Sequence, residues 1–198
     1  MYPFILSSLL ILSCCYQSIA QTEIGIEVGH HQTLFLPEAN SFTNYFHSAH
    51  IGGKVGLFLE REITPSLGIR ANLFYDLKYY EFNSSHYFPY THHAICLPLK
   101  AIFKLGKIVH LGIGVEPMLL IPLKKLSATS NKPLFHIGPC AEIGFRIRKM
   151  MRLSFYCNYD FMPINYNAYG NYTNLTAGVS FAFVLKKMKK RSVIYSPG

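Results

Sequence analysis

The chain has 198 residues, a formal net charge of +9, an apolar fraction of 50% and only 15% charged residues. Its length suits one domain. Beyond the N-terminal segment, no stretch offers the roughly 18 continuous apolar residues of a membrane helix. A chain this apolar without such helices enters a bilayer only as a closed β-barrel, because closure satisfies every backbone polar group in lipid.

The first twenty residues are typical of a signal peptide. Residues 1–16 are mostly apolar and carry no charged side chain, and Ser18 and Ala20 place small residues at positions −3 and −1 of a cleavage site. We expect cleavage after Ala20. An uncleaved anchor and lipoprotein processing at Cys14 remain open alternatives. Because the chain is secreted, we expect no nucleic-acid partner for its positive charge.

From Thr22 onward, apolar and polar residues alternate with a period of two, which predicts β-strands. Eight runs show this alternation: 23–29, 51–60, 67–78, 95–104, 109–117, 135–146, 152–161 and 174–183. An even number of alternating strands suits an antiparallel barrel whose apolar face contacts lipid.

The connections between these runs alternate in length. Three are tight, at 62–66, 105–108 and 149–151, and four are longer and polar, at 32–47, 83–90, 121–133 and 163–170. Outer-membrane barrels have short periplasmic turns and long outer loops. The sequence therefore predicts an all-β, eight-stranded antiparallel up-and-down transmembrane β-barrel over 21–185, after a signal peptide at 1–20 and before a basic periplasmic tail at 186–198.

The polar face is predicted to line the lumen. The alternative is a soluble, lipocalin-like barrel with its apolar face inward around a ligand. Glycine weakens a strand and gains nothing on a wet exterior, whereas it makes room inside a narrow barrel. The polar face carries ten glycines: Gly25, Gly29, Gly52, Gly56, Gly68, Gly112, Gly114, Gly138, Gly144 and Gly178.

Charges on the polar face balance. They are the acids Glu27, Glu60, Asp76, Glu116, Glu142 and Asp160 and the bases Lys54, Arg70, Lys78, Lys100, Arg146 and Arg152. Buried charges persist when they are paired. We therefore predict a lumen filled by ion pairs, without a diffusive pore.

The three cysteines that follow the signal peptide, Cys96, Cys140 and Cys157, are an odd number without metal-ligand spacing. Each lies within a strand pattern, where cysteine acts as a small hydrophobic residue. A disulfide between Cys96 and Cys140 remains an open alternative.

Histidines gather toward the predicted loop ends of the strands. A rim cluster of His47, His50, His92 and His93 is a speculative site for a metal ion or haem, since imidazole binds both. No ligand spacing is diagnostic, so we expect no cofactor.

A lipid-modifying enzyme would need an oriented Ser–His pair. Ser48 with His50, and Ser84 with His86, fall in or beside predicted loops without a placed carboxylate. We expect no enzymatic activity.

Three segments carry a resemblance to a known family. Run 95–104 contains Leu97-Pro98-Leu99-Lys100 and ends in an aromatic and a lysine, 111–117 is rich in glycine, and 158–161 reads Asn-Tyr-Asp-Phe. These segments resemble strands of the PorT-like outer-membrane β-barrel family of Bacteroidota. Phe161 stands where that family has glycine, and the basic tail departs from members that stop at the terminal aromatic of the last strand.

The resemblance implies the barrel fold and, for some members, a part in protein secretion at the outer membrane. Our interpretation is a monomeric barrel of the cell outer membrane with a structural, adhesive or partner-binding role, and accessory membership of a secretion complex is the alternative.

Outer-membrane lipids and lipopolysaccharide are the expected partners. The tail lysines would meet anionic head groups, peptidoglycan or an acidic partner, and Lys124, Lys125 and Lys132 would meet lipopolysaccharide phosphates.

Overall fold

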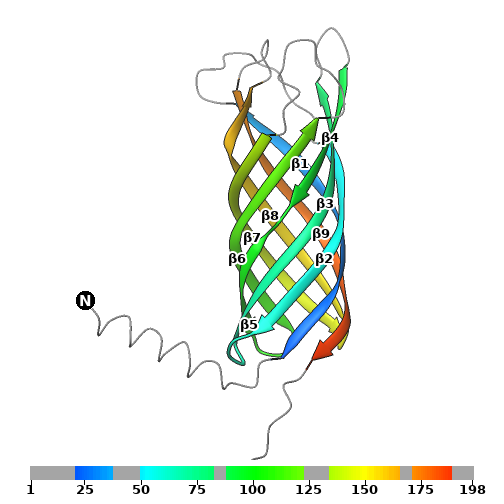
Figure 1. Ribbon diagram of the computed structural model, residues 1–198, viewed down its shortest axis with the longest axis vertical. Coiled ribbons are helices and arrows are strands. Elements are labelled where there is room, and N and C mark those ends of the chain that lie inside the picture. Colours follow the sequence, from blue (N-terminus) through cyan, green and yellow to red (C-terminus); the bar gives the residue numbers. More distant parts are fainter. Residues whose placement is uncertain (1–20, 38–49, 83–87, 123–133, 166–170, 189–198) are drawn as a thin grey trace, which may run out of the picture.

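The computed structural model describes residues 21–37, 50–82, 88–122, 134–165 and 171–188. The predicted signal peptide, the tail beyond Met188 and His47 lie outside these ranges. The described residues form nine strand segments (Figure 1): β1 (Thr22–Pro37), β2 (His50–Glu62), β3 (Leu67–Phe82), β4 (Phe88–Cys96), β5 (Leu99–Leu105), β6 (Val109–Pro122), β7 (Leu134–Arg148), β8 (Met151–Asn165) and β9 (Asn171–Met188). Among these residues, no helix has the length and apolarity needed to cross a bilayer.

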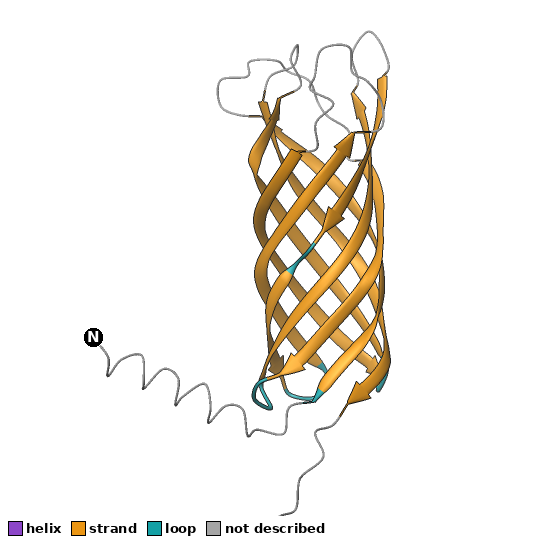
Figure 2. Cartoon of the chain, viewed as in Figure 1, coloured by secondary structure: helices purple, strands orange, loops and turns teal. Residues whose placement is uncertain are grey.

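The nine segments make eight barrel strands, because β4 and β5 are two halves of one strand. Both halves pair with β3 on one side and with β6 on the other. The interruption at Leu97 and Pro98 appears in Figure 2 as a short loop within the barrel wall. Proline has no N–H to donate to a ladder, yet the Pro98 carbonyl accepts from the N–H of Asn72 at 3.0 Å.

The barrel closes where β1 pairs with β9, and every pairing is antiparallel. The predicted eight-stranded antiparallel barrel is therefore confirmed.

The strands run further than the alternation predicts. β1 continues to Pro37 and β8 to Asn165, so the predicted connections 32–47 and 163–170 begin too early. Ladder hydrogen bonding explains the difference: Leu36 is still opposite Thr173 of β9. Ladder hydrogen bonds join backbone groups, so pairing continues past the run 23–29 in which the side chains alternate. At the other end, β9 runs to Met188, three positions past the predicted end of the barrel at 185.

Three short turns lie at one end of the barrel, called here the turn end, and the strand ends that flank 38–49, 83–87, 123–133 and 166–170 lie at the other, the loop end (Figure 1). The β5–β6 turn depends on Gly106, whose φ of 74° favours glycine. In the β2–β3 turn, the Thr64 hydroxyl accepts from the Leu67 N–H at 3.0 Å.

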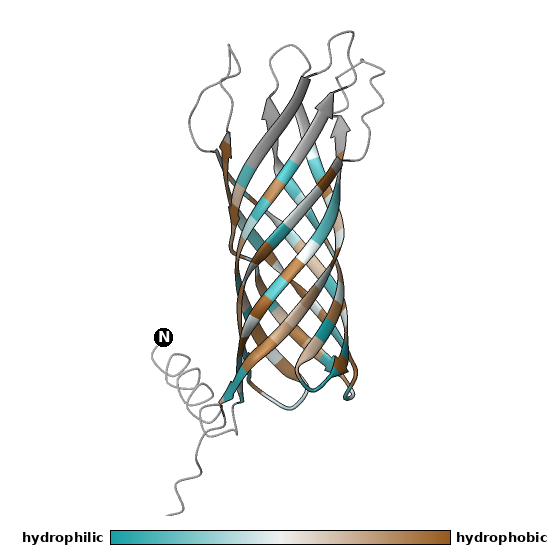
Figure 3. Ribbon diagram, turned by 90° about the vertical axis from the view of Figure 1, so that its right-hand side faces the viewer, coloured by the Kyte–Doolittle hydropathy of each residue, from teal (hydrophilic) through white to brown (hydrophobic). Residues whose placement is uncertain are grey.

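The two faces of the wall differ as predicted. Alternate residues such as Leu57, Leu59 and Leu73 are about half exposed on the outer face, whereas their neighbours Glu60 and Asn72 are buried in the lumen. Figure 3 shows apolar and polar positions alternating along the strands. An apolar exterior around a polar interior is the arrangement of a transmembrane barrel.

Several large apolar side chains also point into the lumen. The alternation of apolar and polar residues did not predict which face they occupy. Phe58, Phe74 and Ile102 are at most 2% exposed. Phe58 packs with Ala182 and Val184. The guanidinium carbons of Arg70 and Arg152 lie 5.5 and 5.8 Å from the centre of its ring. These apolar groups fill space that the ion pairs leave between them.

Candidate functional site

The candidate site is the lumen, and its turn half is built around the carboxylate of Glu60 on β2. Oxygen Oε2 of Glu60 accepts hydrogen bonds from Nε and Nη2 of Arg70 on β3, at 3.0 and 2.8 Å. The same oxygen contacts Nη1 of Arg152 on β8. All three side chains are at most 3% exposed. Charge-assisted hydrogen bonds of this kind are stronger than those between neutral groups.

A second carboxylate extends these contacts across the lumen. Oε1 of Glu142 on β7 accepts from Nη1 of Arg70 at 2.7 Å, and Oε2 contacts Nζ of Lys100 on β5. His110 on β6 places Nε2 at 3.3 Å from the same carboxylate. Arg70 therefore connects two buried acids on opposite sides of the lumen.

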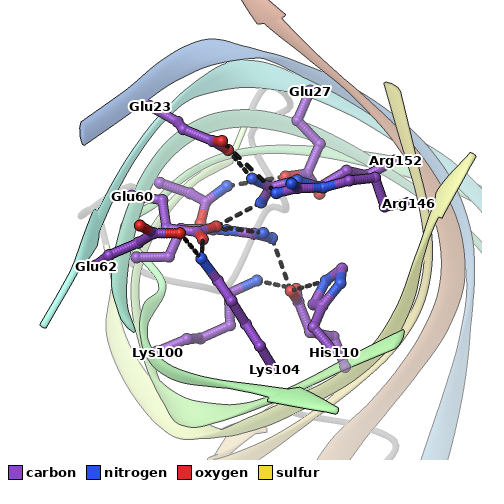
Figure 4. A network of polar contacts seen from close by, with 12 residues as sticks. Glu23, Glu27, Glu60, Glu62, Lys100, Lys104, His110, Arg146 and Arg152 are labelled. Carbon is purple, nitrogen blue, oxygen red and sulfur yellow. Dashed lines mark hydrogen bonds and ion pairs between the residues drawn. The ribbon is translucent and has the colours of Figure 1, made fainter. Parts of the chain in front are cut away.

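Glu23 on β1 completes the cluster near the turn end. It contacts Arg152, and its Oε1 lies 2.8 Å from Nζ of Lys187 and 3.6 Å from Nη2 of Arg146. Lys104 adds a contact to Glu62 and lies 3.5 Å from Glu60. Figure 4 shows these side chains converging from the surrounding strands. We call Glu23, Glu60, Arg70, Lys100, Glu142 and Arg152 the ionic network.

The ionic network joins strands that are far apart around the barrel. Its six members come from β1, β2, β3, β5, β7 and β8. Each charge has at least one partner of opposite sign. Buried charges held this way resist separation, because removing one partner leaves the other charge uncompensated.

The middle of the lumen carries a smaller polar group on the same inward face. Glu27 accepts from Nδ2 of Asn72 at 3.0 Å and from the Ser180 hydroxyl at 2.7 Å. Beside it, Nζ of Lys54 lies 3.2 Å from the ring centre of Tyr156 and 4.5 Å from that of Phe74. Lys54 is thus held over aromatic faces as a cation–π contact.

The loop half contains further contacts between charged and polar side chains. His136 and Asp160 share a 2.7 Å hydrogen bond. Asp76 lies 3.5 Å from His31 and 3.9 Å from Lys78. The Asn174 amide has no hydrogen-bond partner among the described residues, and it borders a cavity of about 10 Å³ together with Lys78 and other polar side chains. Such a volume is close to that of one water molecule.

The turn end opens into a wider vestibule of about 360 Å³. Charged side chains line it: Glu60, Glu62, Lys104, Lys107, Arg146 and Arg152, together with His110. Its floor is formed by members of the ionic network, which lie between it and the loop half of the lumen.

The charges predicted to line the lumen do so, with one difference. Arg146 lies at the mouth and is 31% exposed. The alternation did not include Glu23 in the balanced set and did not assign Lys104 a partner, although both lie on inward positions of their strands. Their contacts depend on tilt and register between strands, which the sequence pattern does not contain.

Three of the four rim histidines lie in described strands. His47 lies outside the described residues, and the backbone of His50 stands opposite Thr33 in the β1–β2 ladder. His92 and His93 are consecutive in β4, where their backbones stand opposite Lys78 and Leu77 of β3. His93 contacts the Tyr75 hydroxyl. Within the described ranges no group of three His, Cys, Asp or Glu side chains could hold a metal ion; the metal or haem hypothesis stays a prediction.

Two further predictions bear on reactive groups. Cys96, Cys140 and Cys157 are all free thiols, so the alternative of a Cys96–Cys140 disulfide is wrong: both are buried in the lumen without a bond between them. Ser48, Ser84 and His86 lie outside the described residues, and the absence of enzymatic activity stays a prediction.

Comparison with known proteins gives a fold and no family. No family model matches the sequence, and no curated protein matches it. Among solved structures, the outer membrane protein OprG from Pseudomonas aeruginosa matches with a TM-score of 0.55 and 11% identity, over 86% of this chain and 96% of OprG. Ail, the attachment invasion locus protein of Yersinia pestis, solved with the heparin analogue sucrose octasulfate, matches with a TM-score of 0.49 and 11% identity over 86% of this chain and 99% of Ail. The OprG match shows that this chain has the fold of a small outer-membrane β-barrel.

Proposed function

We propose that the protein is a monomeric barrel of the bacterial outer membrane whose lumen is closed by its own side chains. Its role is structural, adhesive or partner-binding, carried by the two ends of the barrel, and it is neither a general porin nor an enzyme. The apolar outer wall, the fold and the predicted signal peptide support this location. In this orientation the turn end faces the periplasm and the loop end faces outward.

The ionic network is the observation that carries the proposal. Solutes cross a porin because its lumen is an aqueous channel. Here, Glu60, Arg70 and Glu142 meet across the turn half of the lumen and are each about 1% exposed. A narrow eight-stranded barrel filled in this way leaves no path for a hydrated solute.

Planar-bilayer recording tests the closed lumen. We expect purified protein to insert without stepwise conductance. The double variant Arg70→Ala/Arg152→Ala, which removes two long side chains from the network, should introduce measurable steps. Its control is Lys107→Ala, which removes a lysine at the exposed turn end. Wild-type channels with porin-like conductance would contradict the proposal.

Membrane insertion has an independent test. A transmembrane barrel keeps its compact form in sodium dodecyl sulfate and migrates faster before boiling than after it. We expect this heat-dependent shift for wild-type protein purified from outer membranes. Identical mobility before and after boiling would contradict the barrel.

Membership of a secretion complex is the second candidate. It is favoured by the resemblance of 95–104 and 111–117 to PorT-like strands. A pull-down from native membranes in mild detergent would recover a stable stoichiometric partner in this case. A stand-alone adhesin would recover none and would lose surface binding when 38–49 and 123–133 are deleted.

A further inference from the structure

Three of the five chain segments described at the turn end share one residue pattern. Residues 105–108 read Leu-Gly-Lys-Ile, 147–150 read Ile-Arg-Lys-Met, and 185–188 read Leu-Lys-Lys-Met. Each segment begins and ends with an apolar residue and has lysine in its third position. The other two are the β2–β3 turn at 63–66, which reads Ile-Thr-Pro-Ser, and the start of β1 at Gln21 and Thr22. Neither contains a basic residue.

The apolar residues of this pattern are exposed. Leu105, Ile147 and Leu185 are 54–61% exposed, and each continues the lipid-facing positions of its strand. The closing residues Ile108 and Met150 are 62% and 52% exposed. Apolar groups this accessible at the edge of a lipid-facing wall extend the hydrocarbon contact down to the turns.

The basic residues between them are exposed and mostly unpaired. Lys107, Arg148, Lys149 and Lys186 form no ion pair within the part of the chain that the structure describes, whereas Lys187 turns inward to Glu23. These four positive charges therefore stand at the boundary where the apolar wall ends. Lysine and arginine at such a boundary rest their stems on apolar surface and present the charge to the head groups.

We infer that these segments form a basic collar, made of 105–108, 147–150 and 185–188, that binds the anionic head groups of phospholipids such as phosphatidylglycerol in the adjoining leaflet. The apolar residues on both sides of each charge favour lipid over a peptidoglycan strand or an acidic protein, because those partners offer no hydrocarbon. The β2–β3 turn leaves a gap in the collar. This inference rests on the proposed membrane location.

The chain contains no tryptophan, so one introduced tryptophan reports on its own surroundings. The variant Ile108→Trp places the reporter beside Lys107, and Ile63→Trp places a matched reporter in the β2–β3 turn. Each is reconstituted into vesicles that mix phosphatidylcholine and phosphatidylglycerol, with either lipid brominated in its acyl chains. The ratio of quenching by the two brominated lipids gives the local preference for the anionic one.

We expect a preference of about fivefold at Ile108→Trp, the effect of one lysine at an anionic surface. We expect about onefold at Ile63→Trp combined with Arg61→Gln, which removes the exposed basic residue two positions before that reporter. Adding Lys107→Gln to the first reporter should reduce its preference to about onefold. The triple variant Lys124→Gln/Lys125→Gln/Lys132→Gln removes three positive charges from the segment between β6 and β7 and should leave the preference at Ile108→Trp unchanged. Salt at 1 M should weaken the preference, since the screening length falls to about 3 Å.

The outcomes separate the two proposals. Equal quenching by both brominated lipids at Ile108→Trp would overturn the collar while leaving the membrane barrel intact. Retention on isolated peptidoglycan together with equal quenching would assign the charges to the cell wall. Absence of quenching by either lipid at both reporters would overturn the membrane location and the collar with it.

Discussion

Both halves of the lumen contain acidic and basic side chains but connect them differently: the turn half joins glutamates to arginines and a lysine, and the loop half joins aspartates to histidines and a lysine. In the turn half, Arg70 lies between Glu60 and Glu142, and Arg152 lies between Glu60 and Glu23, so each cation serves two acids. In the loop half, His136 lies 2.7 Å from Asp160, and Asp76 lies 3.5 Å from His31 and 3.9 Å from Lys78. Short contacts with shared partners make the loss of one member felt by several others, whereas contacts of 3.5 Å and longer couple their members more weakly. Stability should therefore concentrate in the turn half and leave the loop half more tolerant of change.

Removal of the central cation is the largest expected effect. Arg70→Met should lower the free energy of unfolding by about 3–5 kcal/mol, because Glu60 and Glu142 both lose a buried partner. Lys78→Met in the loop half should change it by about 1 kcal/mol or less, since its contact to Asp76 is 3.9 Å long and methionine keeps the apolar stem. Urea titration in detergent micelles, followed by circular dichroism, measures both. Equal losses would remove the distinction between the halves.

The His136–Asp160 pair of the loop half should show an intermediate effect. His136→Leu removes the 2.7 Å bond to Asp160 and should cost about 1.5–3 kcal/mol, as expected for a hydrogen bond to a charged group. Thr176→Val is the matched neutral case in the same half, because it removes a 3.1 Å bond to Thr33 and should cost about 0.5–1.5 kcal/mol. A cost for His136→Leu as large as that of Arg70→Met would place a second network in the loop half.

Two adjacent glycines of β2 allow the crowding in the lumen to be compared with the space on the outer face, because successive residues of a strand point to opposite faces. A Cβ at Gly52 would meet the His31 ring and lie 2.7 Å from the Leu77 carbonyl oxygen, whereas the nearest atom to a Cβ at Gly53 is 3.6 Å away. Gly52→Ala should therefore cost about 1–3 kcal/mol. Gly53→Ala should be neutral or stabilise the barrel by up to about 1 kcal/mol. The same urea titration decides, and equal effects would contradict the crowded lumen.

The smallest effect concerns reactivity without a change in stability. Cys157 is exposed on the outer face, whereas Cys96 and Cys140 are buried in the lumen. A membrane-permeant maleimide should label one thiol per folded barrel and three after unfolding in the chain that begins at Gln21, as counted by intact mass. Cys157→Ser should abolish labelling of the folded form. Labelling of Cys140 in the folded barrel would show that the lumen opens.

The sequence by itself determined the barrel, its strand number and its inward face. Alternation with a period of two reports which side of a strand each residue occupies, and alternating connection lengths report antiparallel order. This is why inward charges such as Glu60 and Arg70 were predictable as lumen residues. The split of one strand into β4 and β5 was not predicted, because the pattern through Leu97 and Pro98 keeps its alternation while proline interrupts the ladder.

Tertiary structure decided which charges meet. Arg70 and Glu142 are 72 positions apart in the chain, and their contact depends on the tilt and stagger of strands around a closed wall. The same geometry brings Glu23 to Arg152. It leaves the side-chain amide of Asn174 without a hydrogen-bond partner among the described residues. A period of two assigns a residue to the lumen but not to a height or an angle within it, so the pairing of charges is a property of the closed barrel.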